Sequence, residues 1–454
     1  MVVTIGCAIS QNENSPSDTI ETSVIDETNA MFWRYGFVVT RRSMTIAANT
    51  AVSATAVTNS GIAVRTPLVA SNSASARRCR PRTVTTAIAP ASMAKYGDQL
   101  SEGSKYLLKT FPNYKMIVYP SHRTVSWPDF IYKSTAANAT TCELKGTDDP
   151  DNCVQGFPFP IPKSGAEVIW NHRLKWRGDT VRRNNDQLNV DASGHGQTAQ
   201  LVEDISFLYA NSVNPVPLKE GKGLFLYYLS KIMSPARTAG TMILVNESAG
   251  VGASGRAAWL YAPALKRIRR APAVCCDNPY EGSDGQQFYD QVDMYNGVLE
   301  RYTWKLVGKK EMIIPYNNFK MSRAKYAEIV NPNFPNPNVA RYEKHRVWVV
   351  EANLVPGERH TYAKRTLYVD EDSWDIVMID CYDAKGALFN FQEGFLTPQP
   401  NVQTVFTVPE VIHHFDSGRY FMTALQAEGK PNDYSVKYPD GFFTDSAVQQ
   451  RASK

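Results

Sequence analysis

The chain has 454 residues, of which 43% are hydrophobic and 20% charged, and its formal net charge is +5. This is the composition of a globular protein with a large core, and no run of about 18 apolar residues predicts a transmembrane helix. The charge gives no support to a nucleic-acid-binding protein, because such domains are strongly basic.

Residues 1–90 differ in character from the rest of the chain. They contain eight arginines, no lysine and five acidic residues, and residues 38–95 contain no aromatic residue. The tract is mostly Ala, Thr, Ser and Val without a sustained period, so it buries too little apolar area to offset its backbone entropy. We expect residues 1–90 to be largely disordered. No signal peptide is recognisable, because Met1 is not followed by a basic region and a long apolar run.

From about residue 91 the sequence predicts regular structure. SMAKYGDQLSEGSKYLLKTFP has apolar residues at helical spacing and predicts one or two short helices. Later segments are rich in β-branched and aromatic residues and predict strands. They are AEVIWNHRLKWRG, GTMILVNES, RAAWLYAP, ERYTWKLVGKKEMIIPY, HRVWVVEANL, RTLYVD and WDIVMIDCYD.

Two patterns refine the strand prediction. In RYTWKL, Tyr302, Trp304 and Leu306 share one face, which is the alternation of a strand with one solvated side. YVDEDSWDIVMID predicts a hairpin that turns at residues 370–373.

Residues 256–274, RAAWLYAPALKRIRRAPAV, place five basic side chains around a Trp, a Tyr and two prolines. Alternation puts Trp259 and Tyr261 on one side of a strand that Pro263 ends, and Ile268 begins the returning strand. A hairpin at a sheet edge accounts for the composition, because proline and charge blunt an exposed edge. Its exposed basic rim is formed by Lys266, Arg267, Arg269 and Arg270.

The motif search predicts no catalytic residues, no metal and no cofactor. GVGASG (Gly250, Gly252, Gly255) is followed by a strand-like segment rather than a helix, so we expect a loop between antiparallel strands and not a dinucleotide site. The acidic residues around the predicted turn, Asp370, Glu371, Asp372 and Asp375, are expected to be solvated. A catalytic pair of carboxylates contributed by two distant segments is an alternative that the motifs leave open. No pair has zinc-site spacing among His122, His172, His195, His345, His360, His413 and His414.

The seven cysteines allow more than one arrangement. Cys142 and Cys153 flank the polar loop ELKGTDDPDN, so they are a candidate disulfide of an oxidising compartment, with two free thiols as the alternative. The neighbours Cys275 and Cys276 are expected not to pair with each other. Cys381 is expected in the core, because it shares a strand with apolar residues.

Several long stretches resemble one family. These are WLYAPALKRIRRAP, FYDQVDMYNGVLERYTWKLVGKKEMIIPYNN, HRVWVVEANLVPGERH and RTLYVDEDSWDIVMIDCYDAKG. They resemble an uncharacterised, domain-of-unknown-function family of Gram-negative cell-envelope proteins, described as outer-membrane lipoprotein-sorting. The resemblance spans about residues 91–450. That family is similar to the lipoprotein-localisation carriers and receptors.

The resemblance implies a β-rich α+β fold. We expect a large curved antiparallel sheet, an open half-barrel, with helical plug or lid segments, and one elaborated β-sheet domain over residues 91–454. Family members begin with a signal peptide and a Gly- and Asn-rich motif. The aromatic-free tract stands in its place here, so we expect a misassigned start or a wrong reading frame before residue 91.

The implied function is non-enzymatic: a periplasmic protein that binds or transports a lipid, an acyl chain or another hydrophobic ligand. An envelope or outer-membrane protein is a further expected partner, contact with a membrane is peripheral at most, and no nucleic acid is expected. The alternatives are a secreted hydrolase or carbohydrate-active enzyme and a structural role in an envelope complex. The expected cavity-lining residues are Trp259, Tyr261, Trp304, Trp348, Leu367, Val369, Ile376 and Met378.

Overall fold

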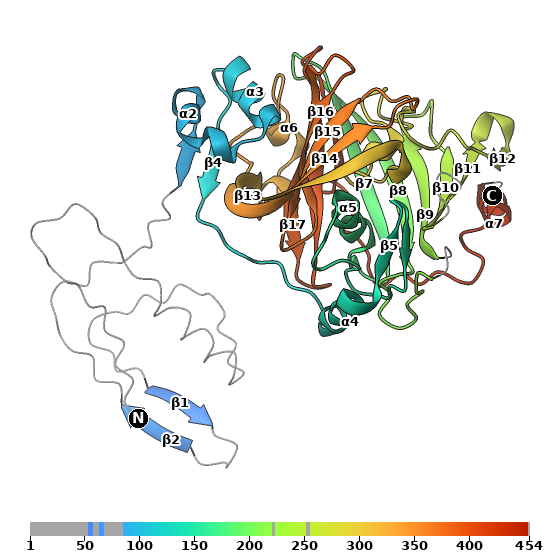
Figure 1. Cartoon of the computed structure of the whole chain (residues 1–454), viewed down its shortest axis with the longest axis horizontal. Coiled ribbons are helices and arrows are strands. Elements are labelled where there is room, and N and C mark those ends of the chain that lie inside the picture. The colour runs from blue at the N-terminus through green and yellow to red at the C-terminus, as the bar shows by residue number, and fades with distance from the viewer. Residues whose placement is uncertain (1–52, 58–62, 68–84, 220–222, 251–254, 453–454) are drawn as a thin grey trace, which may run out of the picture. The chain divides into compact units, whose positions relative to one another are not determined.

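The computed structural model describes residues 53–57, 63–67, 85–219, 223–250 and 255–452 (Figure 1). The chain divides into two compact units, Met1–Pro81 and Arg82–Lys454. In the first unit, β1 (Ser53–Val57) and β2 (Ala63–Pro67) form a two-stranded antiparallel sheet. Most of this unit lies outside the described residues, so the disorder expected for residues 1–90 stays a prediction.

One sheet of 15 strands dominates the second unit. Its strands in chain order are β3 (Thr86–Ile88), β4 (Met116–Tyr119), β7 (Thr180–Val190), β8 (Gly196–Phe207), β9 (Leu224–Ser234), β10 (Met242–Ser248), β11 (Arg256–Ala262), β12 (Arg267–Arg270), β13 (Tyr302–Pro315), β14 (Tyr342–Leu354), β15 (Lys364–Asp370), β16 (Ile376–Tyr382), β17 (Leu388–Gln399), β18 (Thr404–His414) and β19 (Tyr420–Leu425). A separate small hairpin consists of β5 (Glu143–Lys145) and β6 (Asp149–Asp151).

The strand order is β12-β11-β10-β9-β8-β7-β19-β18-β17-β16-β15-β14-β4-β3, and β13 also pairs with β14. Neighbouring strands are antiparallel except β14 and β4, which are parallel. The ends of this path, β12 and β3, do not pair with each other within the described residues, so the sheet is open. The predicted large, open, antiparallel sheet is confirmed, with the parallel pair β14 and β4 as an exception.

The helices are short. They are α2 (Met93–Tyr96), α3 (Glu102–Thr110), α4 (Asp129–Thr141), α5 (Gly165–Leu174), α6 (Tyr326–Ile329) and α7 (Asp445–Ala452). The helices predicted after residue 91 correspond to α2 and α3. Asp380 of β16 accepts hydrogen bonds from the backbone N–H groups of Glu102 (3.0 Å) and Gly103 (2.8 Å), which docks the first turn of α3 on the sheet. No helix in the described residues is long and apolar enough to cross a membrane.

The strand predicted for residues 166–178 is wrong, because most of that segment is α5. Ser164 begins the helix, and its hydroxyl accepts the N–H of Glu167 at 3.2 Å. Nine of the ten residues of α5 are buried, all except Glu167, so the sequence has almost no polar face to reveal a helical period. The helix packs against β13 and β14, where a Cβ at Gly165 would lie 2.7 Å from Val350 (Figure 1).

The basic hairpin is confirmed at the sheet edge. β11 and β12 pair, with Trp259 opposite Arg270 and Tyr261 opposite Ile268, and β12 is the last strand of the path. The hairpin predicted at residues 370–373 is likewise present, because β15 pairs with β16 in antiparallel register. GVGASG connects the antiparallel strands β10 and β11, although residues 251–254 lie outside the described residues.

Candidate functional site

One face of β7, β8, β9 and β10 carries an apolar wall. Register places Val181 opposite Ile205, Ile205 opposite Tyr228, and Tyr228 opposite Val245, so a continuous cross-strand row runs over four neighbouring strands. Figure 1 shows these strands adjacent in the half of the sheet that ends at β12. Side chains two residues apart share a face of a strand, so Phe207, Leu226 and Ile243 extend the same wall.

This wall borders a cavity in which the space open to the centres of water molecules is about 120 Å³. A single water needs only about 10–15 Å³ of such space, so the cavity has room for several waters or for part of a larger apolar molecule. The irregular segment 271–301 between β12 and β13 covers the wall. It contributes Val274, Tyr280, Tyr289, Val292, Asp293 and Asn296. The cavity is therefore bordered by the sheet on one side and by loop residues on the other.

Four arginines and two acidic residues line the same cavity. Arg173 at the end of α5 and Arg256 at the start of β11 share Glu247, at 3.0 and 2.7 Å. Arg177, just after α5, is ion-paired with Asp293. These arginines place hydrogen-bond donors against an otherwise apolar wall.

Arg177 and Arg183 retain donor capacity beside the cavity. The Nε of Arg177 is buried and has no hydrogen-bond partner in the described part of the chain. Arg183 of β7 is ion-paired with Glu203. A guanidinium has five N–H donors and is suited to bidentate contact with a carboxylate or phosphate.

Two carboxyl groups near these arginines differ in charge state. Burial raises the pKa of Asp293, but the charges of Arg177 and Lys175 more than offset this, so its pKa is lowered and it is ionised at neutral pH. Burial, and then the negative charge of Asp293, raise the pKa of Glu410 to about 7. The different surroundings of the two groups set these opposite shifts.

Two of the expected ligand-contacting residues lie on the opposite face of the sheet from the cavity. Trp259 lies opposite Leu244 and Tyr261 opposite Met242, whereas the cavity uses the alternate residues Ile243 and Val245. Trp259 and Tyr261 instead belong to a hydrophobic cluster that includes Val448 of α7. Successive side chains of a strand point to opposite faces of the sheet, so Trp259 and Tyr261 point away from the face that borders the cavity.

The other six expected residues also lie away from the cavity. They pack in or against the main hydrophobic core and are Trp304, Trp348, Leu367, Val369, Ile376 and Met378. None of the eight is among the described residues that line the cavity. Trp304 and Trp348 lie on β13 and β14, which contact α5, whereas Met378 of β16 contacts Ser104 of α3.

The four residues expected as a basic rim, Lys266, Arg267, Arg269 and Arg270, are exposed at the β11–β12 hairpin. The Arg270 guanidinium lies 4.8 Å from the centre of the Trp259 ring. The rim does not line the cavity.

The structure contains two disulfides among the described cysteines. Cys142 is bonded to Cys153 with a Cα–Cα distance of 4.7 Å. Cys275 and Cys276 are also bonded, so the expectation that they do not pair is wrong. The positive φ of Cys276, 64°, turns the chain there and lets the two neighbouring sulfurs meet. Cys381 is free and buried in the core, as predicted.

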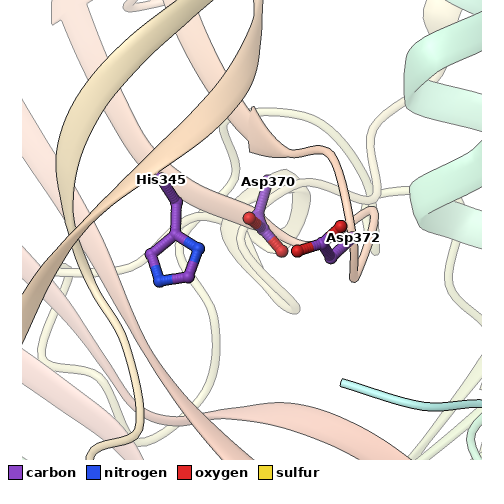
Figure 2. A group of neighbouring side chains, drawn as sticks. All are labelled: His345, Asp370 and Asp372. Carbon is purple, nitrogen blue, oxygen red and sulfur yellow. The ribbon is translucent and has the colours of Figure 1, made fainter. Parts of the chain in front are cut away.

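The expectation of solvated carboxylates at the β15–β16 turn is wrong for two of the four. Asp370 and Asp375 are 0% and 1% exposed. The Lys175 ammonium lies 2.6 Å from Asp375, which explains how that carboxyl group is buried. Asp370 and Asp372 lie beside His345 of β14, a grouping that no local sequence motif predicted (Figure 2).

Sequence reasoning also missed every residue that lines the cavity. Two of them, Val181 and Arg183, share one face of β7, TVRRNNDQLNV, whose polar composition hides this alternation. Others come from segment 271–301, which has no period. The arginines of β7 were a local indication of this site. They could be interpreted only once the strand register showed which face of the sheet carries Arg183.

Comparisons with known proteins agree with the resemblance seen in the sequence. Residues 87–449 match the family described as "Protein of unknown function (DUF1329)". "Uncharacterized protein PA3922" of Pseudomonas aeruginosa is 38% identical over 361 residues, which cover 78% of this chain and 79% of that protein.

Solved structures from other bacteria show weaker similarity. A domain from Vibrio parahaemolyticus, described as outer membrane lipoprotein-sorting, has a TM-score of 0.43 at 16% identity and covers 63% of this chain and 98% of that chain. A DUF1329 family protein from Desulfovibrio piger has a TM-score of 0.42 at 14% identity, with 63% and 97% covered. The family match and the Pseudomonas relative together show that this chain belongs to the DUF1329 family.

Proposed function

We propose that this protein is a non-enzymatic binding or transport protein for a hydrophobic ligand with an anionic end, such as a fatty acid or a lipid. The observation that carries the proposal is the cavity over β7–β10, which combines an apolar wall with four arginine side chains. Ligand sites are typically apolar concavities with a few placed polar groups.

Binding to this cavity would be driven by two physical terms. Removal of apolar ligand surface from water contributes about 25 cal/mol per Å². An anionic end group would accept hydrogen bonds from arginines such as Arg177, whose Nε has no other partner in the described residues. The apolar wall would therefore set affinity, and the arginines would select the charged end.

A comparison of two ligands tests this function directly. Protein freed of lipid by hydrophobic-resin treatment would be titrated with a long-chain fatty acid and with the alcohol of the same chain length. We expect the acid to bind at least tenfold more tightly. Equal binding would refute the anionic end, and failure of both ligands to bind would refute the proposed function.

We propose a periplasmic location for this activity. The Cys142–Cys153 and Cys275–Cys276 bonds support an oxidising compartment, because disulfides are rare in the reducing cytosol. The exposed basic rim would contact an envelope partner or anionic head groups. Each clustered basic residue near an anionic membrane surface contributes about 1 kcal/mol to the binding free energy. Fractionation of cells is expected to place the protein in the periplasm, and recovery from the cytosol with reduced cysteines would contradict this.

A further inference from the structure

A second cluster of polar side chains lies on another part of the sheet, apart from the cavity. His345 is on β14, Asp370 is the last residue of β15, and Asp372 is in the turn that follows. One ligand atom from each lies within 4.8 Å of the others (Figure 2). Pairing of β14 with β15 brings these residues together although they are 25 positions apart in the sequence.

The burial of the Asp370 carboxyl group is not explained by packing of the core alone. The residue is fully buried, and its Oδ1 has no hydrogen-bond partner among the described residues. Its Oδ2 accepts the N–H of Ser373, at 2.9 Å. Figure 2 shows the carboxyl group of Asp370 between the His345 ring and Asp372. A buried carboxylate oxygen without a donor is costly unless a cation or proton satisfies it.

His345 is oriented as a ligand by a second carboxylate. Its Nε2 lies 3.1 Å from Glu343, and Figure 2 shows its other ring nitrogen, Nδ1, facing Asp370. Glu343 is itself held by Asn317, at 2.9 Å, and by Arg341. A carboxylate behind a histidine is the arrangement that fixes metal-ligating imidazoles and raises their basicity.

Tyr316 adds a further unpartnered oxygen. Its ring stacks on His345 with 3.8 Å between centres, the residue is buried, and its hydroxyl has no partner in the described part of the chain.

From these contacts we infer that His345, Asp370 and Asp372 form a binding site for one divalent first-row transition ion such as Zn²⁺. One imidazole with two carboxylates suits such an ion better than Ca²⁺, which takes oxygen ligands only. In a tetrahedral site with metal–ligand bonds of about 2.1 Å, the ligand atoms lie about 3–4 Å from one another. Side-chain rotations that move the ligand atoms by about 1 Å would bring the three residues to this spacing. This inference does not depend on the proposed function.

Arg123 competes with the ion for one ligand. It is 67% exposed and ion-paired with Asp372. The adjacent Glu371 is held by Lys309, at 3.0 Å, and Arg346, at 2.7 Å, and also lies 3.7 Å from Arg123. Removal of Arg123 would free Asp372 for the ion, whereas loss of Glu371 would leave the three ligands in place.

Calorimetric titration of the full-length, chelator-treated chain with ZnCl₂ tests the site. We expect one ion per chain with a dissociation constant in the micromolar range or tighter, at least tenfold weakening in Asp370→Asn and His345→Ala, and three- to tenfold tightening in Arg123→Ala. Glu371→Gln and His195→Gln are the matched controls, since Glu371 is a carboxylate of the same turn and His195 is 86% exposed elsewhere. Both controls should bind as the wild type does.

The outcomes are distinct even if one variant folds poorly. Arg123→Ala changes an exposed residue and predicts a gain of affinity, which loss of folding cannot produce. Absence of one-to-one binding in the wild type, equal affinity in the wild type, Asp370→Asn and Arg123→Ala, or equal weakening by Glu371→Gln would each overturn the inference.

Discussion

Arg365 of β15 donates a hydrogen bond from Nη2 to Asp290 at 2.6 Å, and both side chains are buried, with 1% and 3% of their surfaces exposed. The Nε2 of His360 lies 3.0 Å from the same carboxylate. Asp290 belongs to segment 271–301, which also supplies Val292 and Asp293 to the cavity. The pair therefore fastens the loop wall of the cavity to the sheet.

Replacement of Asp290 by Asn should destabilise the protein by about 3–5 kcal/mol, because it leaves the Arg365 charge buried without a counter-charge. Urea unfolding of the variant measures this. Asp284→Asn is the control: Asp284 is ion-paired with Arg419 at the surface, with 55% and 38% exposure, and such pairs are worth about 0–1 kcal/mol. Equal losses in both variants would contradict the role given to Asp290.

Glu410 should make stability depend on pH. It accepts hydrogen bonds from Thr407 (3.0 Å) and the N–H of Met294 (3.1 Å), and its pKa is raised from 4.5 to about 7. Between these values the folded state binds more protons than the unfolded state, so stability falls as pH rises.

We therefore expect the wild type to lose on the order of 1–3 kcal/mol relative to Glu410→Gln between pH 4.5 and pH 7. Denaturant unfolding at several pH values measures the difference. Glu311→Gln, which changes a carboxylate that is 64% exposed, is the control. A constant difference for Glu410→Gln would show that this carboxyl group titrates normally.

The bond between Cys142 and Cys153 closes a loop with a sequence separation of 11. Its replacement by two serines should cost about 3 kcal/mol of stability, because the unfolded chain regains the closed-loop entropy. The matching double serine variant of Cys275 and Cys276, whose separation is 1, closes no such loop and should cost less. Equal thermal unfolding of the two variants, or alkylation of Cys142 in exported, unreduced protein, would be evidence against this account.

Trp259→Ala separates packing from ligand binding. Trp259 lies half-buried in the cluster that holds α7, on the face opposite the cavity. Its loss should lower stability by about 1–3 kcal/mol, less than for a fully buried Trp, and should leave fatty-acid affinity within about twofold. The double variant Arg267→Ser and Arg269→Ser should change neither, since both side chains are exposed. A large loss of affinity in Trp259→Ala would place the ligand on the other face.

Strand alternation made much of the sheet predictable. Tyr302 and Trp304 are buried and Thr303 is exposed, as the pattern in RYTWKL predicts. Patterns fail where both faces are buried, as in α5, or where an ion pair permits burial of a charge, as at Asp375.

The candidate sites depend on relationships that a single strand does not contain. The cavity arises from the register of β7 to β10 together with a loop without periodicity. The cluster at His345 requires β14 to pair with β15. Residue types therefore predicted the sheet but not which of its faces would form a cavity.

Mass spectrometry of the organic extract from natively purified protein tests the central claim most directly. The wild type should yield about one equivalent of an acidic amphipathic compound, and so should Val307→Phe, which enlarges a side chain that is 53% exposed. Val245→Phe fills the cavity wall and should lose the compound while it remains folded. A wild-type extract without such a compound, or an equal amount from folded Val245→Phe, would contradict a ligand carried in this cavity.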